Sequence, residues 1–323
     1  GTDLAKDNRQ APRSRHLLHP ALQDAMDARP RLELSPEAVP AIRASMKFET
    51  IEDPLERGVE RREIKLERPN DDGSLRCLMY TPLERATPMP AYLHIHGGGY
   101  LIGAPEMSDP MNVLVASKLG CIVLSVDYRL APEHPAPCGI DDCFLSLAWL
   151  HEEAERLGVD TARIAVGGES AGGGMAASLA LKARDDSRFP ICHQQLTYPM
   201  IDDRTGRPGH PLDATVGEYV WTPEMNVAGW DMYLAGAAPA APTVAARAES
   251  LAGLPPTWIM TGTLDLFRDE NIVYAKRLMA AQVPTDLSVY AGACHAFQAV
   301  KDSELAKRYV VEHLTALARG LSA

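Results

Sequence analysis

The pattern of hydrophobic and polar residues becomes strand-like from about Arg61 onward. Eight short runs of apolar or alternating residues predict β-strands in this part of the chain. These runs are Glu63 to Arg68, Ser74 to Thr81, Ala91 to His96, Cys121 to Val126, Arg163 to Val166, Cys192 to Tyr198, Thr257 to Thr261 and Thr285 to Tyr290.

Apolar residues at helical spacing lie between several of these runs. They predict helices over Asp141 to Leu157, Ala171 to Ala183 and Asn271 to Ala281. Strands that alternate with helices along a chain are typical of a parallel sheet. The sequence therefore predicts an α/β fold in which helices flank a mostly parallel, eight-stranded sheet.

Two segments stand outside this alternation. The first fifty residues predict two short helices, one beginning at Pro20 and one capped by Ser35 with Pro36 at its first position. The stretch from Asp202 to Glu249 is rich in Pro, Gly and Ala and carries one helical aromatic patch, Thr222 to Tyr233. We interpret this stretch as an insertion above the sheet.

Composition limits the partners that the chain can have. Of its 323 residues, 46% are hydrophobic and 23% are charged, which suits a large buried core and excludes a disordered or fibrous chain. The 32 Lys and Arg residues against 43 Asp and Glu residues give a net charge of −11, which repels nucleic acid and anionic lipid. No apolar run approaches the roughly 18 residues that a membrane helix needs. We therefore expect no nucleic-acid or membrane partner.

The cysteines indicate the compartment. Six cysteines lie singly in apolar stretches without a CxxC pair, which predicts reduced core residues in a cytoplasmic protein. The polar segment Gly1 to Gln10 also lacks the apolar centre of a signal peptide. Because the chain begins with Gly1 rather than Met, an exported precursor stays open.

The strongest chemical motif is the run Gly168-Glu169-Ser170-Ala171-Gly172, which lies between a predicted strand and a predicted helix. A serine on such a tight turn presents its hydroxyl above the sheet, and the flanking glycines let strand and helix approach each other. A small-residue turn before a packed helix can give the same string, so the motif needs supporting residues.

A glycine run at the end of the third predicted strand gives that support. Residues His94 to Tyr100 are His-Ile-His-Gly-Gly-Gly-Tyr. Consecutive glycines let main-chain N–H groups approach a developing oxyanion, although a flexible loop is the alternative. A phosphate loop would continue with Gly-Lys-Ser/Thr, which does not follow. His94 and His96 could bind a metal, but glycines follow instead of further ligands, so we expect no metal.

A serine nucleophile needs a histidine base that is oriented by a carboxylate. Of the ten histidines, His295 follows the last predicted strand, where an α/β-hydrolase topology needs the base. Asp265 ends the penultimate strand, and Asp269 is the alternative acid. Asp269 looks like a residue in the first turn of a helix, where a carboxylate is favourable without any catalytic task. The resulting order Ser, Asp, His is that of α/β-hydrolases and differs from that of chymotrypsin.

Residues Asp127 to Pro135, with the sequence DYRLAPEHP, lie between the two glycine motifs. With these motifs, the chain from about Arg61 to its end resembles the hormone-sensitive-lipase-like esterases, the bacterial family IV branch of the α/β-hydrolase superfamily. The resemblance implies a nucleophile with two catalytic partners and three N–H groups that form an oxyanion hole. These are Ser170, with Asp265 and His295, and the N–H groups of Gly98, Gly99 and Ala171.

The resemblance also implies a division of the chain into N-terminal helices that contribute to a cap, a hydrolase core in two parts and a cap insertion. The corresponding ranges are 1–55, then 56–201 with 250–323, and 202–249. Three departures from the family pattern are small. Glu169 stands where Asp is frequent, Leu266 replaces a frequent Pro, and Ala296 replaces the usual Gly. None of them removes a reacting group.

The implied function is that of a serine carboxylesterase that hydrolyses short- to medium-chain monocarboxylic esters through an acyl-enzyme. It would need no cofactor, and its partner would be a small-molecule ester; a homodimer stays open. Two other functions also stay open: a ligand-binding receptor of the same fold, which would lack the histidine base, and an amidase or peptidase with the same triad.

Five side chains of the insertion are candidates for lining the substrate pocket, with core packing as the alternative for each. They are Tyr219, Trp221, Met225, Trp230 and Tyr233. In the DYRLAPEHP run, we expect Arg129, Glu133 and His134 to form a polar network under the site without a chemical role.

Overall fold

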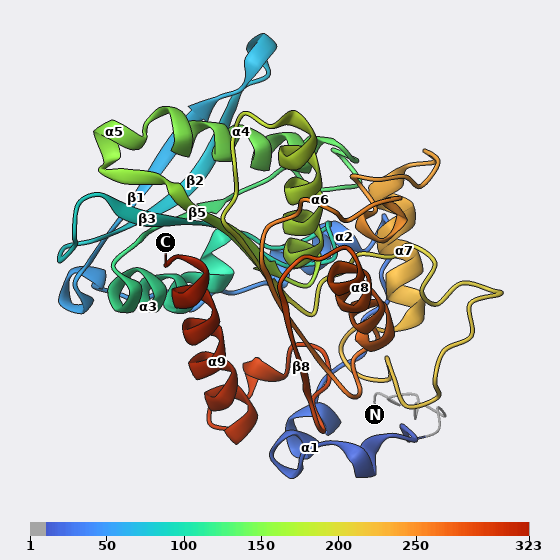
Figure 1. Cartoon of the computed structure of the whole chain (residues 1–323). Coiled ribbons are helices and arrows are strands. Elements are labelled where there is room, and N and C mark those ends of the chain that lie inside the picture. Colours follow the sequence, from blue (N-terminus) through green and yellow to red (C-terminus); the bar gives the residue numbers. More distant parts are fainter. Residues whose placement is uncertain (1–10, 323) are drawn as a thin grey trace.

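The computed structural model describes residues 11–322 and confirms the predicted sheet (Figure 1). Its eight strands have the order β1-β2-β4-β3-β5-β6-β7-β8. The β1/β2 and β2/β4 pairs are antiparallel, and the other neighbouring strands are parallel. The strands are β1 (Val59–Glu67), β2 (Ser74–Pro82), β3 (Met89–Ile95), β4 (Ile122–Val126), β5 (Val159–Glu169), β6 (His193–Thr197), β7 (Thr257–Gly262) and β8 (Thr285–Tyr290).

Helices cover both faces of the sheet. Helices α3 and α9 lie on one face, and α4, α6 and α8 lie on the other (Figure 1). The inner strands β3, β4, β6 and β7 are buried along their whole length, as expected for strands that are covered on both sides. The helices are α1 (Pro20–Asp27), α2 (Val39–Ser45), α3 (Asp109–Leu119), α4 (Cys138–Glu152), α5 (Ala154–Leu157), α6 (Ala171–Asp186), α7 (Pro223–Leu234), α8 (Arg268–Ala280) and α9 (Glu304–Gly320).

The second predicted N-terminal helix begins later than expected, which corrects the predicted start at Pro36. The Ser35 hydroxyl accepts a hydrogen bond from the Ala38 amide at 3.2 Å, and this turn precedes α2, which begins at Val39. Pro40 explains the shift. A helix that began at Pro36 would need an N–H donor at residue 40, and proline has none. In a helix that begins at Val39, Pro40 lies in the first turn, where no N–H group has a partner within the helix.

The insertion and the N-terminal segment lie outside the sheet. The predicted aromatic helix of the insertion is α7, and a loop with one short 3₁₀ turn, Ala245–Arg247, follows it. Residues 1–10, which belong to the predicted N-terminal segment and carry the polar start, lie outside the described residues.

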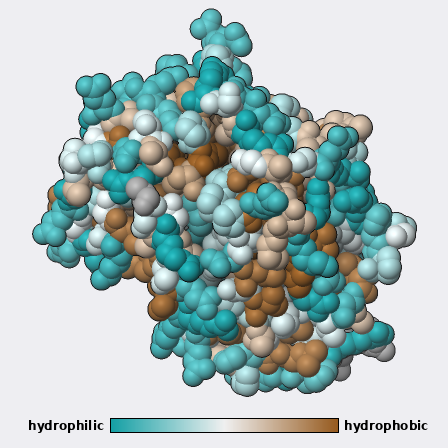
Figure 2. Space-filling view, viewed as in Figure 1, coloured by the Kyte–Doolittle hydropathy of each residue, from teal (hydrophilic) through white to brown (hydrophobic). Residues whose placement is uncertain are grey.

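The face shown in Figure 2 is mostly hydrophilic, with hydrophobic side chains gathered toward its centre. No helix in the described part of the chain combines the length and the apolar character that a bilayer crossing requires.

The parallel strands determine where functional residues can meet. Strands β3, β5, β7 and β8 point in one direction, so the loops that follow their carboxyl ends lie at the same edge of the sheet. In open α/β sheets, ligands bind at this edge. The loops with Gly98, Ser170, Asp265 and His295 all follow these four strands.

Candidate active site

Ser170 occupies the sharp turn between β5 and α6. Its backbone has φ +57° and ψ −119°, a conformation that costs an L-residue about 1–3 kcal/mol. The turn is held because the Ser170 amide donates to the Thr197 carbonyl at 2.9 Å, and the Ser170 carbonyl accepts from Met200 at 2.9 Å. A side chain at Gly172 would collide with the Ile95 carbonyl, which explains the need for glycine there. The local sequence therefore presents the serine hydroxyl at the sheet edge.

His295 reaches the serine from the loop after β8. Its Nε2 atom lies 2.8 Å from Ser170 Oγ, and its Nδ1 atom lies 2.8 Å from Asp265 Oδ2. All three side chains are buried. In this arrangement, the N–H group at Nδ1 donates a hydrogen bond to the carboxylate. The Nε2 atom carries no proton and is therefore free to accept the serine proton. The structure thus brings together the three side chains that the sequence singled out for this chemistry.

The alternative acid, Asp269, lies elsewhere. It is exposed in the first turn of α8, where its carboxylate accepts a hydrogen bond from Arg268 at 2.9 Å. Asp265, in contrast, accepts from the Phe267 amide at 2.8 Å through the oxygen that does not contact His295. This second hydrogen bond fixes the orientation of the carboxylate.

The loops that carry the acid and the base support each other. The Leu264 amide donates to the Ala293 carbonyl at 3.0 Å, which joins the two loops. Ala296, which stands where the family usually has glycine, has φ +58°, a left-handed conformation that glycine adopts without strain. Leu266 is buried and packs against Gly217 of the insertion. The two departures in these loops leave the contact between His295 and Asp265 intact.

The glycine loop after β3 lies beside the serine. Gly98 has φ +120°, and a side chain there would collide with the Ile102 carbonyl. Within residues 11–322, the N–H groups of Gly98 and Gly99 donate to no backbone carbonyl. Ala171 is the first residue of α6, where an N–H group has no partner within the helix. These three N–H groups are available for an oxyanion.

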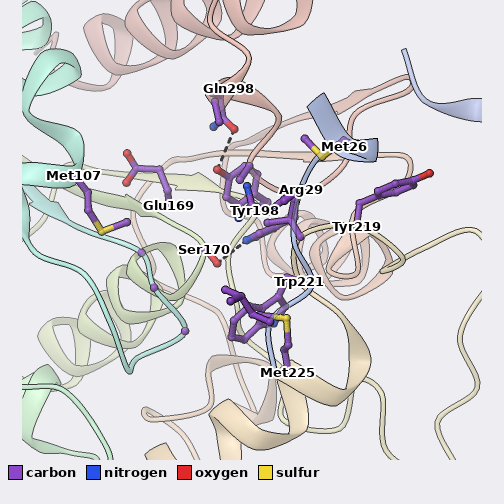
Figure 3. A pocket seen from close by; sticks show the side chains of 18 of the residues that line it. Met26, Arg29, Met107, Glu169, Ser170, Tyr198, Tyr219, Trp221, Met225 and Gln298 are labelled. Atoms are coloured by element: carbon purple, nitrogen blue, oxygen red, sulfur yellow. Dashed lines mark hydrogen bonds between the residues drawn. The ribbon is translucent and has the colours of Figure 1, made fainter. Parts of the chain in front are cut away.

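An open cavity of about 1970 Å³ contains Ser170 and His295. Its walls come from the glycine loop, the N-terminal segment, the insertion and α9. Of the five candidate pocket residues, Tyr219, Trp221 and Met225 line it (Figure 3). The Trp221 ring also covers Gly99, which places it directly beside the candidate oxyanion hole.

Trp230 and Tyr233 do not line this cavity, which corrects their inclusion among the pocket residues. Both are buried against Tyr100, with ring centroids 5.4 Å and 3.9 Å from the Tyr100 ring. They are three residues apart on α7 and therefore lie on one face of this helix. That face packs against the core, so core packing accounts for both residues.

Trp230 provides a test of this packing. Replacing it with alanine should lower the free energy of unfolding by about 3–5 kcal/mol, because the side chain is fully buried and leaves a large void. Denaturant titration of the wild type and of Trp230→Ala measures the difference. A raised KM for a small ester without a loss of stability would contradict the core assignment.

Other cavity residues were not predicted from the sequence. Among them are Met26, Arg29, Met107, Tyr198 and Gln298. The Tyr198 ring lies 4.3 Å from the His295 ring, and its hydroxyl donates to Gln298 Oε1 at 3.0 Å (Figure 3). Its only local signal is an aromatic residue at the carboxyl end of a strand. The other four carry no motif, because distant parts of the chain bring them to the cavity.

His94 and His96 both have protein partners. His94 Nε2 lies 2.8 Å from a carboxylate oxygen of Glu169. His96 Nδ1 lies 2.6 Å from the Gly97 carbonyl oxygen, and its ring stacks on Tyr128 at 4.3 Å. Burial lowers the pKa of His96 to about 4, so this imidazole is neutral at pH 7. These contacts give both histidines a structural role.

The DYRLAPEHP run does not form the single polar network that the sequence suggested. Arg129 binds Asp142, with its Nε atom 3.1 Å from Oδ2. Glu133 instead binds Arg43 of α2, and His134 is exposed. These residues face different neighbours, since one end of the run packs against α4 and the other meets the N-terminal segment.

A family model described as alpha/beta hydrolase fold matches residues 92–299. This match spans more than half of the chain and includes Ser170, Asp265 and His295. The chain belongs to this family. The sheet order and the position of the site at the carboxyl edge of the sheet agree with an alpha/beta hydrolase.

Several esterases are similar to this chain. Esterase LipI of Mycobacterium tuberculosis is 38% identical over 204 residues, which cover 61% of this chain and 62% of LipI. Carboxylesterase NlhH of the same organism is 38% identical over 213 residues, covering 62% of this chain and 64% of NlhH. The aligned region therefore spans less than two thirds of either relative. An arylesterase of Saccharolobus solfataricus is 33% identical over 72% of this chain and 75% of its own length.

Solved structures of alpha/beta hydrolases agree over almost the whole chain. A bacterial heroin esterase has a TM-score of 0.83 at 36% identity, covering 95% of this chain and 99% of its own. Esterase LipW from Mycobacterium marinum has a TM-score of 0.84 at 34% identity, covering 97% of this chain and 98% of its own. The comparisons confirm the fold and the resemblance to hormone-sensitive-lipase-like esterases.

Proposed function

We propose that this chain is a serine carboxylesterase that acts through an acyl-enzyme. The observation that carries the proposal is the relay from Ser170 Oγ to His295 Nε2, and from His295 Nδ1 to Asp265, with 2.8 Å at each step. A buried histidine that is held in this way can remove the serine proton as Oγ attacks an ester carbonyl. The esterase names of its relatives support the same reaction.

The candidate oxyanion hole accounts for the charge that this attack creates. The former carbonyl oxygen would accept hydrogen bonds from the N–H groups of Gly98, Gly99 and Ala171. His295 then gives its proton to the departing alcohol, which leaves an ester bond between Ser170 and the acyl group. Water, deprotonated by His295, cleaves this bond, releases the acid and restores the serine.

We also propose that the N-terminal segment 1–55 and the insertion 202–249 act together as a cap over the hydrolase core, 56–201 with 250–323. Cavity-lining residues from the described part of both segments, such as Met26 and Trp221, support this division. The six cysteines are free thiols, which supports a cytoplasmic location.

The cavity walls predict the preferred acyl length. Met26, Trp221 and Met225 are buried, whereas Arg29 and Glu33 on the same cavity are exposed. Each buried methylene contributes about 0.8 kcal/mol, but a chain that outgrows the apolar part meets a charged rim. We therefore expect kcat/KM to peak between acetyl and octanoyl in a series of p-nitrophenyl esters from acetate to palmitate. A profile that still rises at palmitate would contradict this expectation.

The same assay separates the remaining functions. Release of p-nitrophenol with a stoichiometric amount of acid, over many turnovers, identifies an esterase; binding without turnover identifies a receptor. A p-nitroanilide with the acyl group of the best ester tests for an amidase. We expect the ester to be hydrolysed much faster than this matched amide, because an amine is the poorer leaving group.

A further inference from the structure

Glu169 places a carboxylate in the cavity next to the candidate nucleophile. Its side chain is 21% exposed and lines the same cavity as Ser170. Glu169 and Met107 lie on one side of Ser170, whereas Met26 and Arg29 lie on the other (Figure 3). The relay of Ser170, His295 and Asp265 does not use this carboxylate.

Glu169 is ionised at pH 7. Its two carboxylate oxygens lie 2.8 Å and 3.1 Å from His94 Nε2. Burial raises the pKa of Glu169, but the contact with His94 lowers it by more, so the pKa lies below its ordinary value. The other ring nitrogen of His94 contacts the uncharged groups Ser125 Oγ, at 2.9 Å, and Asn112 Nδ2, at 3.3 Å. Glu169 therefore brings a negative charge to the cavity wall.

Cationic side chains line the cavity as well. They are Arg29, Arg31, Lys47, Lys301 and Lys307. In the part of the chain that the structure describes, none of them forms an ion pair with Glu169, and Lys301 instead binds Glu49 at 2.9 Å. The carboxylate is thus a fixed negative charge in a partly dehydrated space, where attraction to a cation is stronger than in bulk water.

The surroundings of Glu169 suit an alkylammonium group. The cavity is lined by the rings of Tyr198 and Tyr309 and by the Met107 side chain. Burial raises the pKa of both tyrosines, and the nearby charge of Glu169 raises it further. Both phenols are therefore neutral at pH 7. Aromatic faces attract ammonium groups, and apolar walls accept the methyl groups that such a cation carries.

We propose that Glu169 forms a subsite for an ammonium group, so that the enzyme favours esters with a quaternary or protonated amine near the scissile bond. The proposal rests on the esterase function proposed above and names a substrate class for it. Glu169 would act as a specificity-determining residue through charge attraction to the substrate. The net charge of −11 adds attraction for such cations at long range.

A pair of isosteric esters tests this proposal. Choline butyrate and 3,3-dimethylbutyl butyrate have the same shape and differ by a quaternary nitrogen in place of a carbon. We expect the ratio of their kcat/KM values to fall about tenfold in Glu169→Gln, which keeps a hydrogen-bond acceptor for His94 but removes the charge. The two esters can differ in intrinsic reactivity, but this difference is the same for the wild type and for Glu169→Gln. It therefore cancels when the ratio of kcat/KM values is compared between the two enzymes.

A matched control removes a charge from the rim. Glu224 lines the same cavity but is exposed at the start of α7. Its charge is screened by water and salt, so Glu224→Gln should change the ratio less than twofold. An equal fall of the ratio in both variants would indicate general steering by negative charge and would overturn the assignment to Glu169.

A second pair places the cation on the acid. The ethyl ester of 4-(trimethylammonio)butyrate and ethyl 5,5-dimethylhexanoate show whether Glu169 faces the acyl group. A charge-dependent fall of the ratio in either pair supports the subsite, and the responding pair shows which part of the ester it binds. Unchanged ratios in both pairs would overturn the proposal.

Inhibition of the wild-type enzyme gives an independent measurement if Glu169→Gln does not fold. Tetramethylammonium chloride should inhibit hydrolysis of the neutral ester competitively, and KCl at the same ionic strength should not. Equal effects of both salts would overturn the subsite. Hydrolysis of 3,3-dimethylbutyl butyrate tests the proposed function separately, because it needs no cation.

Discussion

Replacing Ser170 with alanine should lower kcat by at least about 10⁴-fold for a p-nitrophenyl ester of preferred length. The covalent step cannot occur without the serine oxygen, whereas the glycine loop still binds the carbonyl. The fold should remain intact because alanine removes only the hydroxyl, whose one described partner is His295. Steady-state kinetics with a far-UV circular dichroism spectrum check both parts of this expectation.

A second serine of the cavity provides the control. Ser108 lines the same cavity but takes no part in the relay. Ser108→Ala should keep most of the activity, and a fluorophosphonate should label Ser170 alone, with one adduct per chain. Turnover that survives in Ser170→Ala, or an adduct on another serine, would remove Ser170 from its assigned role.

The base and the acid should contribute unequally. His295→Ala should be about as damaging as Ser170→Ala, because no other described group contacts Ser170 Oγ. Asp265→Asn should lose about 10 to 100 times less activity, since a misoriented imidazole still accepts some protons. The double variant of Ser170 and His295 should be no slower than either single variant, because the relay acts as one unit.

Asp269→Asn is the matched control for the acid. Its carboxylate is exposed and contacts Arg268 rather than His295. We expect kcat to change less than about twofold, since removing an exposed ion pair costs little. A larger loss in Asp269→Asn than in Asp265→Asn, at equal stability, would move the role of the acid to Asp269.

The residues of the relay could be located from the sequence because each lies close to a local motif. Ser170 is fixed by its own glycine turn, and Asp265 and His295 follow apolar runs that end abruptly. Parallel strands bring such loops to one edge of the sheet, whatever the details of packing. Sequence separation therefore did not hinder these assignments.

Helix α3 was not predicted from the sequence, and its surroundings explain why. Its residues Asn112, Val113, Val115 and Ala116 are all buried, because the sheet covers one side and α9 packs against it. A helix that is buried on several sides has no single apolar stripe, so the periodic signal disappears. The element is clear only after its neighbours are known.

The pocket residues were predicted only in part for a similar reason. Trp221, Met225 and Trp230 belong to one aromatic patch, yet Trp221 and Met225 line the cavity while Trp230 packs on Tyr100. Tertiary contacts decide which face of the patch meets the core. The sequence could suggest the patch but not the direction of each side chain.

The N-terminal segment has a consequence for synthesis on the ribosome. Leu22 and Met26 of α1 are buried in a cluster with Tyr290 and Phe297, and the His19 amide donates to the Gly292 carbonyl at 3.0 Å. The start of the described chain therefore packs against the loop that carries His295.

These partners leave the ribosome at very different times. Translation proceeds at about 5–20 residues per second, so the apolar side chains of α1 emerge tens of seconds before Tyr290 and Phe297. During that interval they are exposed to other nascent chains and to chaperones. The newborn protein should thus gain activity only after β8 and the loop that carries His295 have left the ribosome, because these segments give α1 a surface on which to pack.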